Sequence, residues 1–242
     1  MKKLFVLVLI VLALAAFSMA DIYIKSKVHT DPMSMMGQNR PATDTISEQW
    51  IGDDVYANNT DKISVIVNLK KNVMNLIYPQ DKTYIETTLP LDMSNLLPKE
   101  MAAMASMMKV SVAVTSNGQT KTVGQWKCAG YDVTMTIMGM PMKMLVWATP
   151  EVPFDMDKYM EKMYGNMIKA QMMLDDTGVL EMKKVKGFWI ASEMNMEMMG
   201  QKMHTTTEVL EISKKNAPAA IYSVPEGYTK QDKLSMKQMQ QR

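Results

Sequence analysis

Methionine is the residue type in this sequence with the most distinctive chemistry. It accounts for 30 of the 242 residues, against one cysteine, two histidines and four phenylalanines. A thioether is a soft ligand that selects Cu(I), and it is also an unbranched, polarizable group that adapts to apolar ligands of different shape. On a β-strand, the recurring spacing Met-x-Met places both sulfurs on one side of the sheet. The pattern therefore fits a metal site, an apolar ligand site or simple core filling, and the sequence leaves all three open.

The best candidate for a metal site lies where two expected strands meet at the turn Gly200-Gln201. Three methionines and a histidine come together there in the sequence: Met198, Met199, Met203 and His204. Thioether and imidazole groups are both ligands of copper. A methionine-rich Cu(I)-binding protein is therefore one interpretation, and no other cofactor is expected.

Candidates for an apolar ligand site come from expected strands and helices that each carry one apolar face. Residues alternate within Tyr131–Met138, Met142–Thr149 and Phe188–Met198, and they recur at helical spacing in two other segments. The candidate lining residues are Met101, Met104, Met135, Ile137, Met142, Met144, Met160, Met163, Met167, Met194 and Met196. Because each buried methylene contributes about 0.8 kcal/mol, a modest acyl chain would bind such a wall without a polar anchor.

The sequence offers little from which to build an enzyme. The two histidines, His29 and His204, lie at the ends of expected strands, and the carboxylate pairs lie in expected turns. Cys128, in a strand context, is typical of a small buried side chain rather than a nucleophile. The motifs of nucleophile-elbow hydrolases, zinc proteases and phosphate-binding loops are absent. We therefore expect a protein without catalytic activity.

The first 20 residues predict a cleavable secretory signal peptide. Lys2 and Lys3 precede an apolar run of 14 residues, and Ser18-Met19-Ala20 provides small residues where a signal peptidase reads, so that cleavage before Asp21 is expected. The apolar run is shorter than the roughly 20 residues that span a bilayer. No cysteine stands near the cleavage point, which argues against a lipid anchor. We expect a periplasmic or secreted protein with no stable membrane insertion after cleavage.

The charge balance of the mature chain disfavours nucleic acid as a partner. After loss of the signal peptide, 25 Lys and Arg residues face 25 Asp and Glu residues. A formally neutral domain has no electrostatic attraction for a phosphate backbone.

The segments that must position these side chains predict one domain, residues 21–242, of the α+β class. About ten or eleven strands are expected, with short turns that make neighbouring strands antiparallel and form a meander between 43 and 88. Two helices are expected, over Met93–Met108 and from Asp155 to Leu174, with Phe154 against Tyr159 at the start of the second. Asn117-Gly118 predicts a hairpin turn, Val179–Lys186 a strand, and 31–40 a flexible loop.

The chain resembles an uncharacterised exported bacterial family of the LolA/LolB-like superfamily of periplasmic lipoprotein carriers. The similarity rests on the signal peptide and on four short motifs: Trp50-Ile51-Gly52-Asp53, Lys82-Thr83-Tyr84, the passage from Trp126 to Tyr131, and the passage from Val224 to Tyr228. The resemblance implies a strongly curved, incomplete antiparallel barrel whose open face is covered by two helices. It also implies acyl-chain binding in the concavity. Arg40 and Arg242 are the only arginines, so the ligand-contacting arginine of the carriers has no counterpart, and the cargo can differ.

Together these features predict a periplasmic, non-catalytic binding protein for a hydrophobic ligand, such as a lipid or a lipoprotein acyl chain. A Cu(I)-binding protein is the first alternative. The second is a structural or interaction module of the cell envelope, with an exposed sheet edge or the 31–40 loop in contact with a partner protein.

Overall fold

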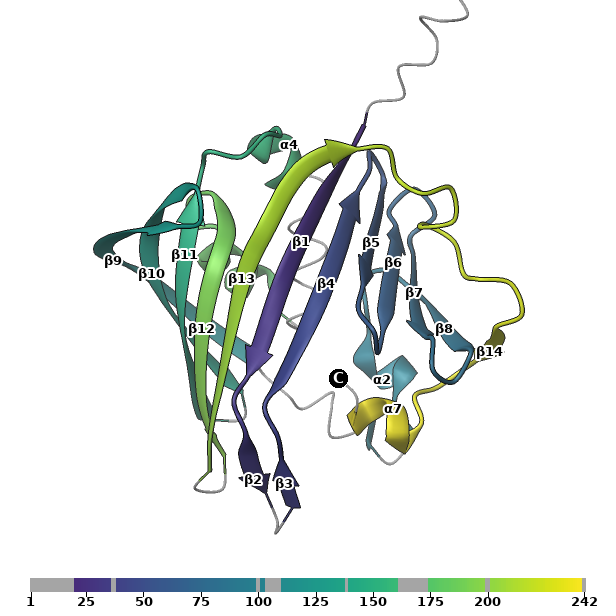
Figure 1. The fold of residues 1–242 in the computed structure, drawn as a ribbon. Coiled ribbons are helices and arrows are strands. Elements are labelled where there is room, and N and C mark those ends of the chain that lie inside the picture. Colours follow the sequence, from purple (N-terminus) through teal and green to yellow (C-terminus); the bar gives the residue numbers. More distant parts are fainter. Residues whose placement is uncertain are drawn as a thin grey trace, which may run out of the picture.

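One large sheet dominates the computed structural model, which describes residues 20–35, 38–98, 101–102, 110–137, 139–160, 174–198 and 201–240. The sheet has 12 strands in the order β14-β8-β7-β6-β5-β4-β1-β13-β12-β11-β10-β9 (Figure 1). Their bounds are β1 Asp21–Thr30, β4 Thr43–Ile51, β5 Val55–Asn59, β6 Ser64–Asn68, β7 Val73–Tyr78, β8 Thr83–Thr88, β9 Val110–Val123, β10 Trp126–Ile137, β11 Met140–Thr149, β12 Phe188–Met198, β13 Gln201–Lys215 and β14 Thr229–Gln231. Two short strands, β2 (Met33–Met35) and β3 (Gln38–Arg40), form a separate hairpin.

Two meanders make up the sheet, and the pairing of β1 with β13 joins them. The first runs from β4 to β8 and the second from β9 to β13, each with neighbours consecutive in the chain. β1 pairs with β4 on one side and with β13 on the other, in both cases antiparallel. The register from Asp21↔Lys215 to Thr30↔Thr205 spans the whole of β1. The sheet is therefore continuous only because its first strand is paired with its last long one.

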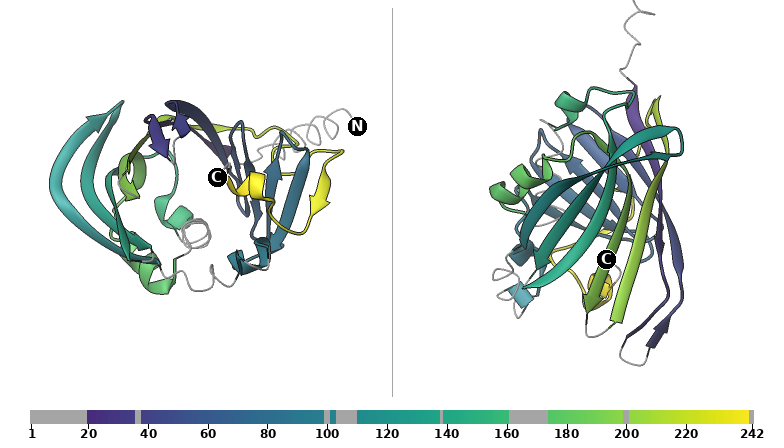
Figure 2. Two further views of the ribbon diagram at one scale, coloured as in Figure 1. Left: turned by 90° about the horizontal axis from the view of Figure 1, so that it is seen from below. Right: turned by 90° about the vertical axis from the view of Figure 1, so that its left-hand side faces the viewer.

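The sheet is strongly curved, and the described helices lie on its concave side (Figure 2). They are short: α2 Met93–Leu96, α4 Met156–Tyr159, α6 Asp176–Met182 and α7 Met236–Gln240. On the other face, the segment 217–228 covers Tyr23, Trp50 and Ile66 with side chains such as Ile221 and Tyr222. None of the helices in the described ranges is long and apolar enough to cross a membrane.

The predicted α+β class is wrong. The described residues are mostly strand, the sheet is an open 12-stranded one rather than a barrel, and helix is scarce. The sheet is also mixed, because β14 runs parallel to β8 while every other pairing in it is antiparallel. The number of strands predicted from the sequence is too low, because β5 and β14 were missed. The segment 33–40, which was predicted as a loop, contains β2 and β3. Parts of the two predicted helices lie outside the described residues, namely 99–100, 103–109 and 161–173.

The predicted turn at Asn117-Gly118 is a bulge inside one long strand. β9 continues from Val110 to Val123, and its register against β10 shifts between Ala129 and Tyr131. The Asn117 side chain occupies the space beside Gly130, where an added Cβ would lie 2.5 Å from the Asn117 amide oxygen. The left-handed backbone of Gly118 (φ +70°) is therefore used to insert residues opposite Gly130, not to reverse the chain.

The predicted strand at 179–186 is also wrong, because its first half, 179–182, belongs to α6 and the rest is turn. The Asp175 side chain accepts a hydrogen bond from the Gly178 amide at 2.8 Å, which caps the helix N-terminus. Val179, Met182 and Val185 recur every three residues and are buried in the cluster formed by β9, β10 and β11. The Glu181 carboxylate accepts a hydrogen bond from the backbone amide of Val114, which attaches α6 to the edge strand β9.

Gly187 is the position at which the chain passes from α6 into β12. Its φ is +107°, and an added Cβ would lie 2.3 Å from the carbonyl carbon and oxygen of the buried Thr149. Gly139, at φ +80°, has nothing within 4 Å of the same position. The two glycines therefore share a left-handed backbone but differ in the space around them.

We predict that Gly187→Ala lowers the free energy of unfolding by more than about 3 kcal/mol, because backbone strain and a backbone clash add. Gly139→Ala is the matched control and should cost only about 1–2 kcal/mol, the left-handed penalty alone. Urea unfolding followed by circular dichroism measures both. Equal losses for the two variants would contradict the close approach to Thr149.

Candidate functional site

Methionines from four neighbouring strands form a continuous row across the sheet. Met135 of β10 is directly paired with Met142 of β11. Met142 is paired in turn with Met196 of β12, and Met196 with Met203 of β13. Because directly paired residues lie on the same face with Cβ atoms about 4.5–5.5 Å apart, their thioethers are neighbours. We call Met135, Met142, Met196 and Met203 the methionine row.

A second row runs beside the first, two residues away from it on each strand. Its members are Val133, Met144, Met194 and Thr205, again in direct register. Side chains two apart on a strand share a face, so both rows belong to one surface. We call the six methionines of the two rows the methionine face. It lies on the concave side, because Met135, Met142 and Met144 pack in the cluster that contains Met182 and Val185 from the α6 segment.

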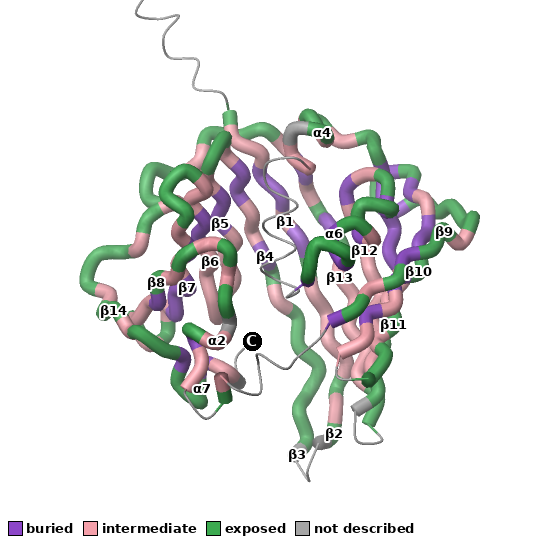
Figure 3. The backbone as a smooth tube through the Cα atoms, turned by 180° about the vertical axis from the view of Figure 1, so that it is seen from behind, coloured by how far each residue is buried: buried purple, intermediate pink, exposed green. Residues whose placement is uncertain are grey.

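The methionine face is only partly buried. Met135 is 5% exposed, whereas the other five methionines have intermediate exposure. Figure 3 shows the same trend along the backbone, with buried stretches of β10 to β13 giving way to intermediate ones toward the end that carries the rows. These five partly exposed methionines can contact a ligand without a change in the sheet.

The other predicted lining residues are distributed as follows. Ile137 and Met160 are partly buried and pack against the same cluster as Met142 and Met144, as predicted for one apolar surface. Met101 is 38% exposed and is not among the residues packed on that cluster. Met104, Met163 and Met167 lie outside the described residues.

A buried hydrogen-bond donor lies in the apolar cluster on which the methionine face packs. Trp189 of β12 packs on the same cluster as Met144 and Met160. Its indole nitrogen is buried and has no hydrogen-bond partner in the described part of the structure. An unsatisfied buried N–H costs about 1–3 kcal/mol, so this group would gain from an acceptor atom brought by a ligand.

The four residues of the predicted metal site do not converge on one point. Met203 and His204 are consecutive in β13, so their side chains project from opposite faces of the sheet. Met199 lies outside the described residues, as does the side chain of Met198. Within the described ranges, no group of three or more His, Cys, Asp or Glu side chains is arranged to hold a metal ion.

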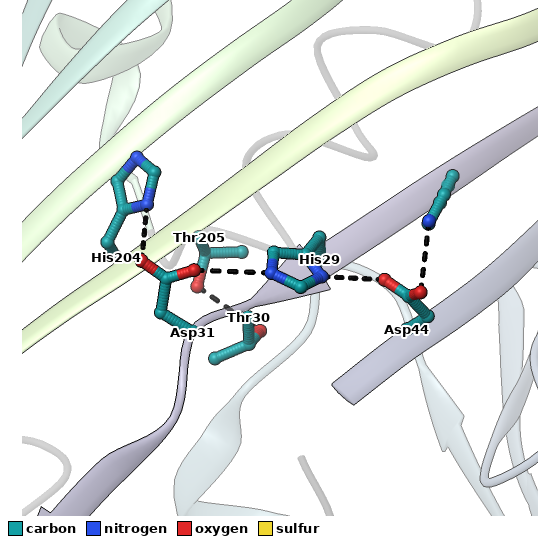
Figure 4. Close-up of polar contacts among 7 residues, drawn as sticks. His29, Thr30, Asp31, Asp44, His204 and Thr205 are labelled. Carbon is teal, nitrogen blue, oxygen red and sulfur yellow. Dashed lines mark hydrogen bonds and ion pairs between the residues drawn. The ribbon is translucent and has the colours of Figure 1, made fainter. Parts of the chain in front are cut away.

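The sequence did not predict that the two histidines meet. Asp31 accepts hydrogen bonds from both: its Oδ1 lies 3.2 Å from His29 Nε2 and its Oδ2 lies 3.0 Å from His204 Nδ1 (Figure 4). His29 Nδ1 lies 2.7 Å from Asp44 Oδ1, and Lys27 Nζ lies 3.0 Å from Asp44 Oδ2. We call these five residues the His–Asp cluster. Its members come from β1, β4, β13 and the residue that follows β1, and therefore they link three adjacent strands.

Hydrogen bonds in the His–Asp cluster favour the charged forms of His29 and Asp44. The hydrogen bond to Asp44 raises the pKa of His29 above its ordinary 6.5, and Asp31 adds to this effect. His29 and Lys27 lower the pKa of Asp44 below its ordinary 3.8. The His29 and Asp44 side chains are 38% and 54% exposed, so solvent screens these interactions. The cluster has the character of a surface link between strands rather than of a desolvated catalytic site.

Cys128 and Tyr159 pack in the core. Cys128 is free and 2% exposed, and burial raises the pKa of its thiol, as expected for a core residue. Burial likewise raises the pKa of Tyr159, whose ring packs on Phe154 with centroids 5.6 Å apart, which confirms the predicted contact.

Comparisons with known proteins give a family but no activity. Residues 42–228, from β4 to the segment that precedes β14, match the model of a family described as a domain of unknown function, DUF4412. No curated protein matches the chain. Among solved structures, it is similar to a DUF1329 family protein from Desulfovibrio piger ATCC 29098, with a TM-score of 0.34 and 10% identity, over 88% of this chain and 93% of that chain.

We predict that the link made by the His–Asp cluster depends on pH. Because the folded pKa of His29 is raised, its contribution to stability is complete below 6.5 and is lost as pH rises through the folded value. The contribution of Asp44 is lost at the acid end, as pH falls through its lowered pKa. The thermal unfolding temperature of His29→Gln should therefore lie further below that of the wild type at about pH 5.5 than at about pH 8.

NMR titration of His29 provides the direct measurement, with Asp44→Asn expected to return its pKa toward 6.5. An unchanged His29 titration in that variant would contradict the pairing.

Proposed function

This chain belongs to the DUF4412 family, and we propose that it is an exported, non-catalytic protein that binds a hydrophobic ligand, such as a lipid or an acyl chain, on its methionine face. The observation that carries the proposal is the direct register of methionines across four strands on the concave side. Five of the six are partly exposed, although apolar surface of this size is normally closed within a core. Membership of the LolA/LolB-like superfamily is part of the proposal, supported by the single curved sheet.

The chemistry of the face suits a flexible chain better than a rigid ring. Thioethers adjust through three rotatable bonds, so that they follow a ligand whose shape varies. The indole N–H of Trp189 provides a donor at the margin of the face for a carboxylate or ester oxygen. The combination of an adaptable apolar wall and one buried donor favours an amphiphile, with its polar end near β12.

The interaction-module alternative has no comparable support. The large apolar side chains that are exposed among the described residues lie on separate parts of the fold: Ile46, Met101, Met140, Leu180, Leu210 and Met236. Apolar side chains exposed singly are ordinary on a protein surface.

Export is supported by how the predicted cleavage point relates to the sheet. β1 begins at Asp21, directly after Ala20, so the predicted mature chain starts with its first strand. Asp21 already takes part in the fold, because its carboxylate accepts a hydrogen bond from the Tyr222 hydroxyl at 2.9 Å. Cleavage at this point would remove no described strand or helix.

We predict that charge on the methionine face weakens ligand binding. Met142→Lys and Met196→Lys should each raise the Kd for a fluorescent fatty acid about tenfold, because each variant loses about two methylene contacts with the ligand. Met236→Lys is the control, because Met236 is 61% exposed on α7. Thermal unfolding shows that each variant is folded, and native mass spectrometry of wild type purified from the exported fraction should show bound amphiphile. Wild type that is repeatedly empty and binds no probe would refute the proposal.

We also predict that the exported protein has the intact mass of residues 21–242. Small side chains at 18 and 20 are required by signal peptidase, whereas position 19 tolerates bulk. Ala20→Leu should therefore block processing, and Met19→Leu should be processed like wild type. An unprocessed wild-type chain would show that the first 20 residues are not a cleaved signal.

A further inference from the structure

The methionine row has a second chemical property that ligand binding through apolar contact does not use. We propose that Met142, Met196 and Met203 form a binding site for Cu(I), with three thioether sulfurs as the ligands. These residues occupy three adjacent strands, β11, β12 and β13, in direct register, with Met196 in the middle. Of the four residues that the sequence suggested for a metal site, only Met203 belongs to this one.

The sheet places the three side chains at a spacing from which their sulfurs can converge. Adjacent strands lie about 4.8 Å apart, and directly paired residues have Cβ atoms about 4.5–5.5 Å apart on one face. A methionine side chain has three rotatable bonds beyond the backbone, so sulfurs from the two flanking strands can turn toward the central one. The rigid part of the site is therefore the backbone ladder, and the adjustable part is the thioether.

The exposure of the row distinguishes three of its members from the fourth. Met142, Met196 and Met203 are partly exposed, whereas Met135 is 5% exposed in the core cluster. An ion reaching the row thus meets the first three sulfurs, while the sulfur of Met135 is occupied by packing. The strands that carry the row are paired with their neighbours on both sides of these residues, so the site can form without a change in the sheet.

The donor set determines which ion would bind. Neutral thioethers are soft ligands that select Cu(I), whereas Zn(II), Mg(II) and Ca(II) require imidazole, thiolate or oxygen ligands. The polar side chains of this part of β12 and β13, Asn195, Glu197 and His204, alternate with the methionines and so project from the opposite face. The methionine side of the sheet therefore presents sulfur without carboxylate or imidazole at the row.

The test separates metal ligation from apolar contact by replacing sulfur without removing apolar volume. Leucine is close in volume to methionine but provides no ligand, so Met142→Leu/Met196→Leu/Met203→Leu should keep the fold. Cu(I) is titrated anaerobically into the exported protein against a competing chromogenic chelator. Wild type should bind one equivalent, and the triple variant should bind at least about a hundredfold more weakly. Met236→Leu is the matched control and should bind Cu(I) as wild type does.

A single variant and a spectroscopic measurement test the same site independently of the triple variant. The single variant Met196→Leu, which removes only the central sulfur, should weaken binding about tenfold and serves if the triple variant does not fold. X-ray absorption should show sulfur as the only neighbour of the bound ion. The proposal is overturned if wild type takes up no Cu(I), if the leucine variants bind it as tightly as wild type, or if the ion has nitrogen or oxygen neighbours. Fatty-acid binding should survive in the leucine variants, so failure here leaves the lipid proposal intact, and the reverse also holds.

Discussion

The antiparallel ladder between β1 and β13 is the interaction on which the rest of the structure depends. It pairs residues 175 apart in the sequence, such as Thr30 and Thr205, and it joins two meanders that would otherwise be separate sheets. Ile24 of β1 and Val209 and Ile212 of β13 are buried in one core cluster, so the ladder is supported by packing as well as by hydrogen bonds. Because the cost of closing a loop grows only slowly with its length, burial along one ladder can offset so distant a pairing.

The methionine face is a consequence of register in the second meander. A slip of one residue between β11 and β12 would bring Glu193 and Asn195 opposite Met144 and Met142 and turn the β12 methionines to the other face. The same ladders thus decide whether this surface is sulfur-rich or acidic. The same partly exposed methionines take part in both proposed binding functions. An acyl chain contacts the apolar surface of the thioethers, whereas a soft ion binds the lone pairs of their sulfurs.

Sequence reasoning succeeded where the determining contacts are local. The β4–β8 meander, apart from the missed β5, followed from short turns. The contact of Phe154 with Tyr159 followed from their spacing at a helix start. It failed where tertiary packing decides. Asn117-Gly118 has the composition of a hairpin turn but lies opposite Gly130 in a continuous strand. Val179 and Met182 lie in a helix because Asp175 caps it and β9 packs beside it.

Individual methionine faces were predictable from alternation, because a strand has a period of two. Their alignment into rows was not, because it depends on which strands are neighbours and in which register. For the same reason no local signal could place His29 and His204 on one aspartate, since β1 and β13 come from opposite ends of the chain.

The central position of β1 in the sheet limits the order in which the strands can pair during folding. The strand that is synthesised first is flanked in the sheet by β4 and by a partner that is among the last segments to be made. During synthesis β1 is therefore available long before β13, and one edge of that strand stays unpaired until β13 is made. Pairing over such separations is slow. The topology itself delays completion of the sheet until nearly the whole polypeptide is present.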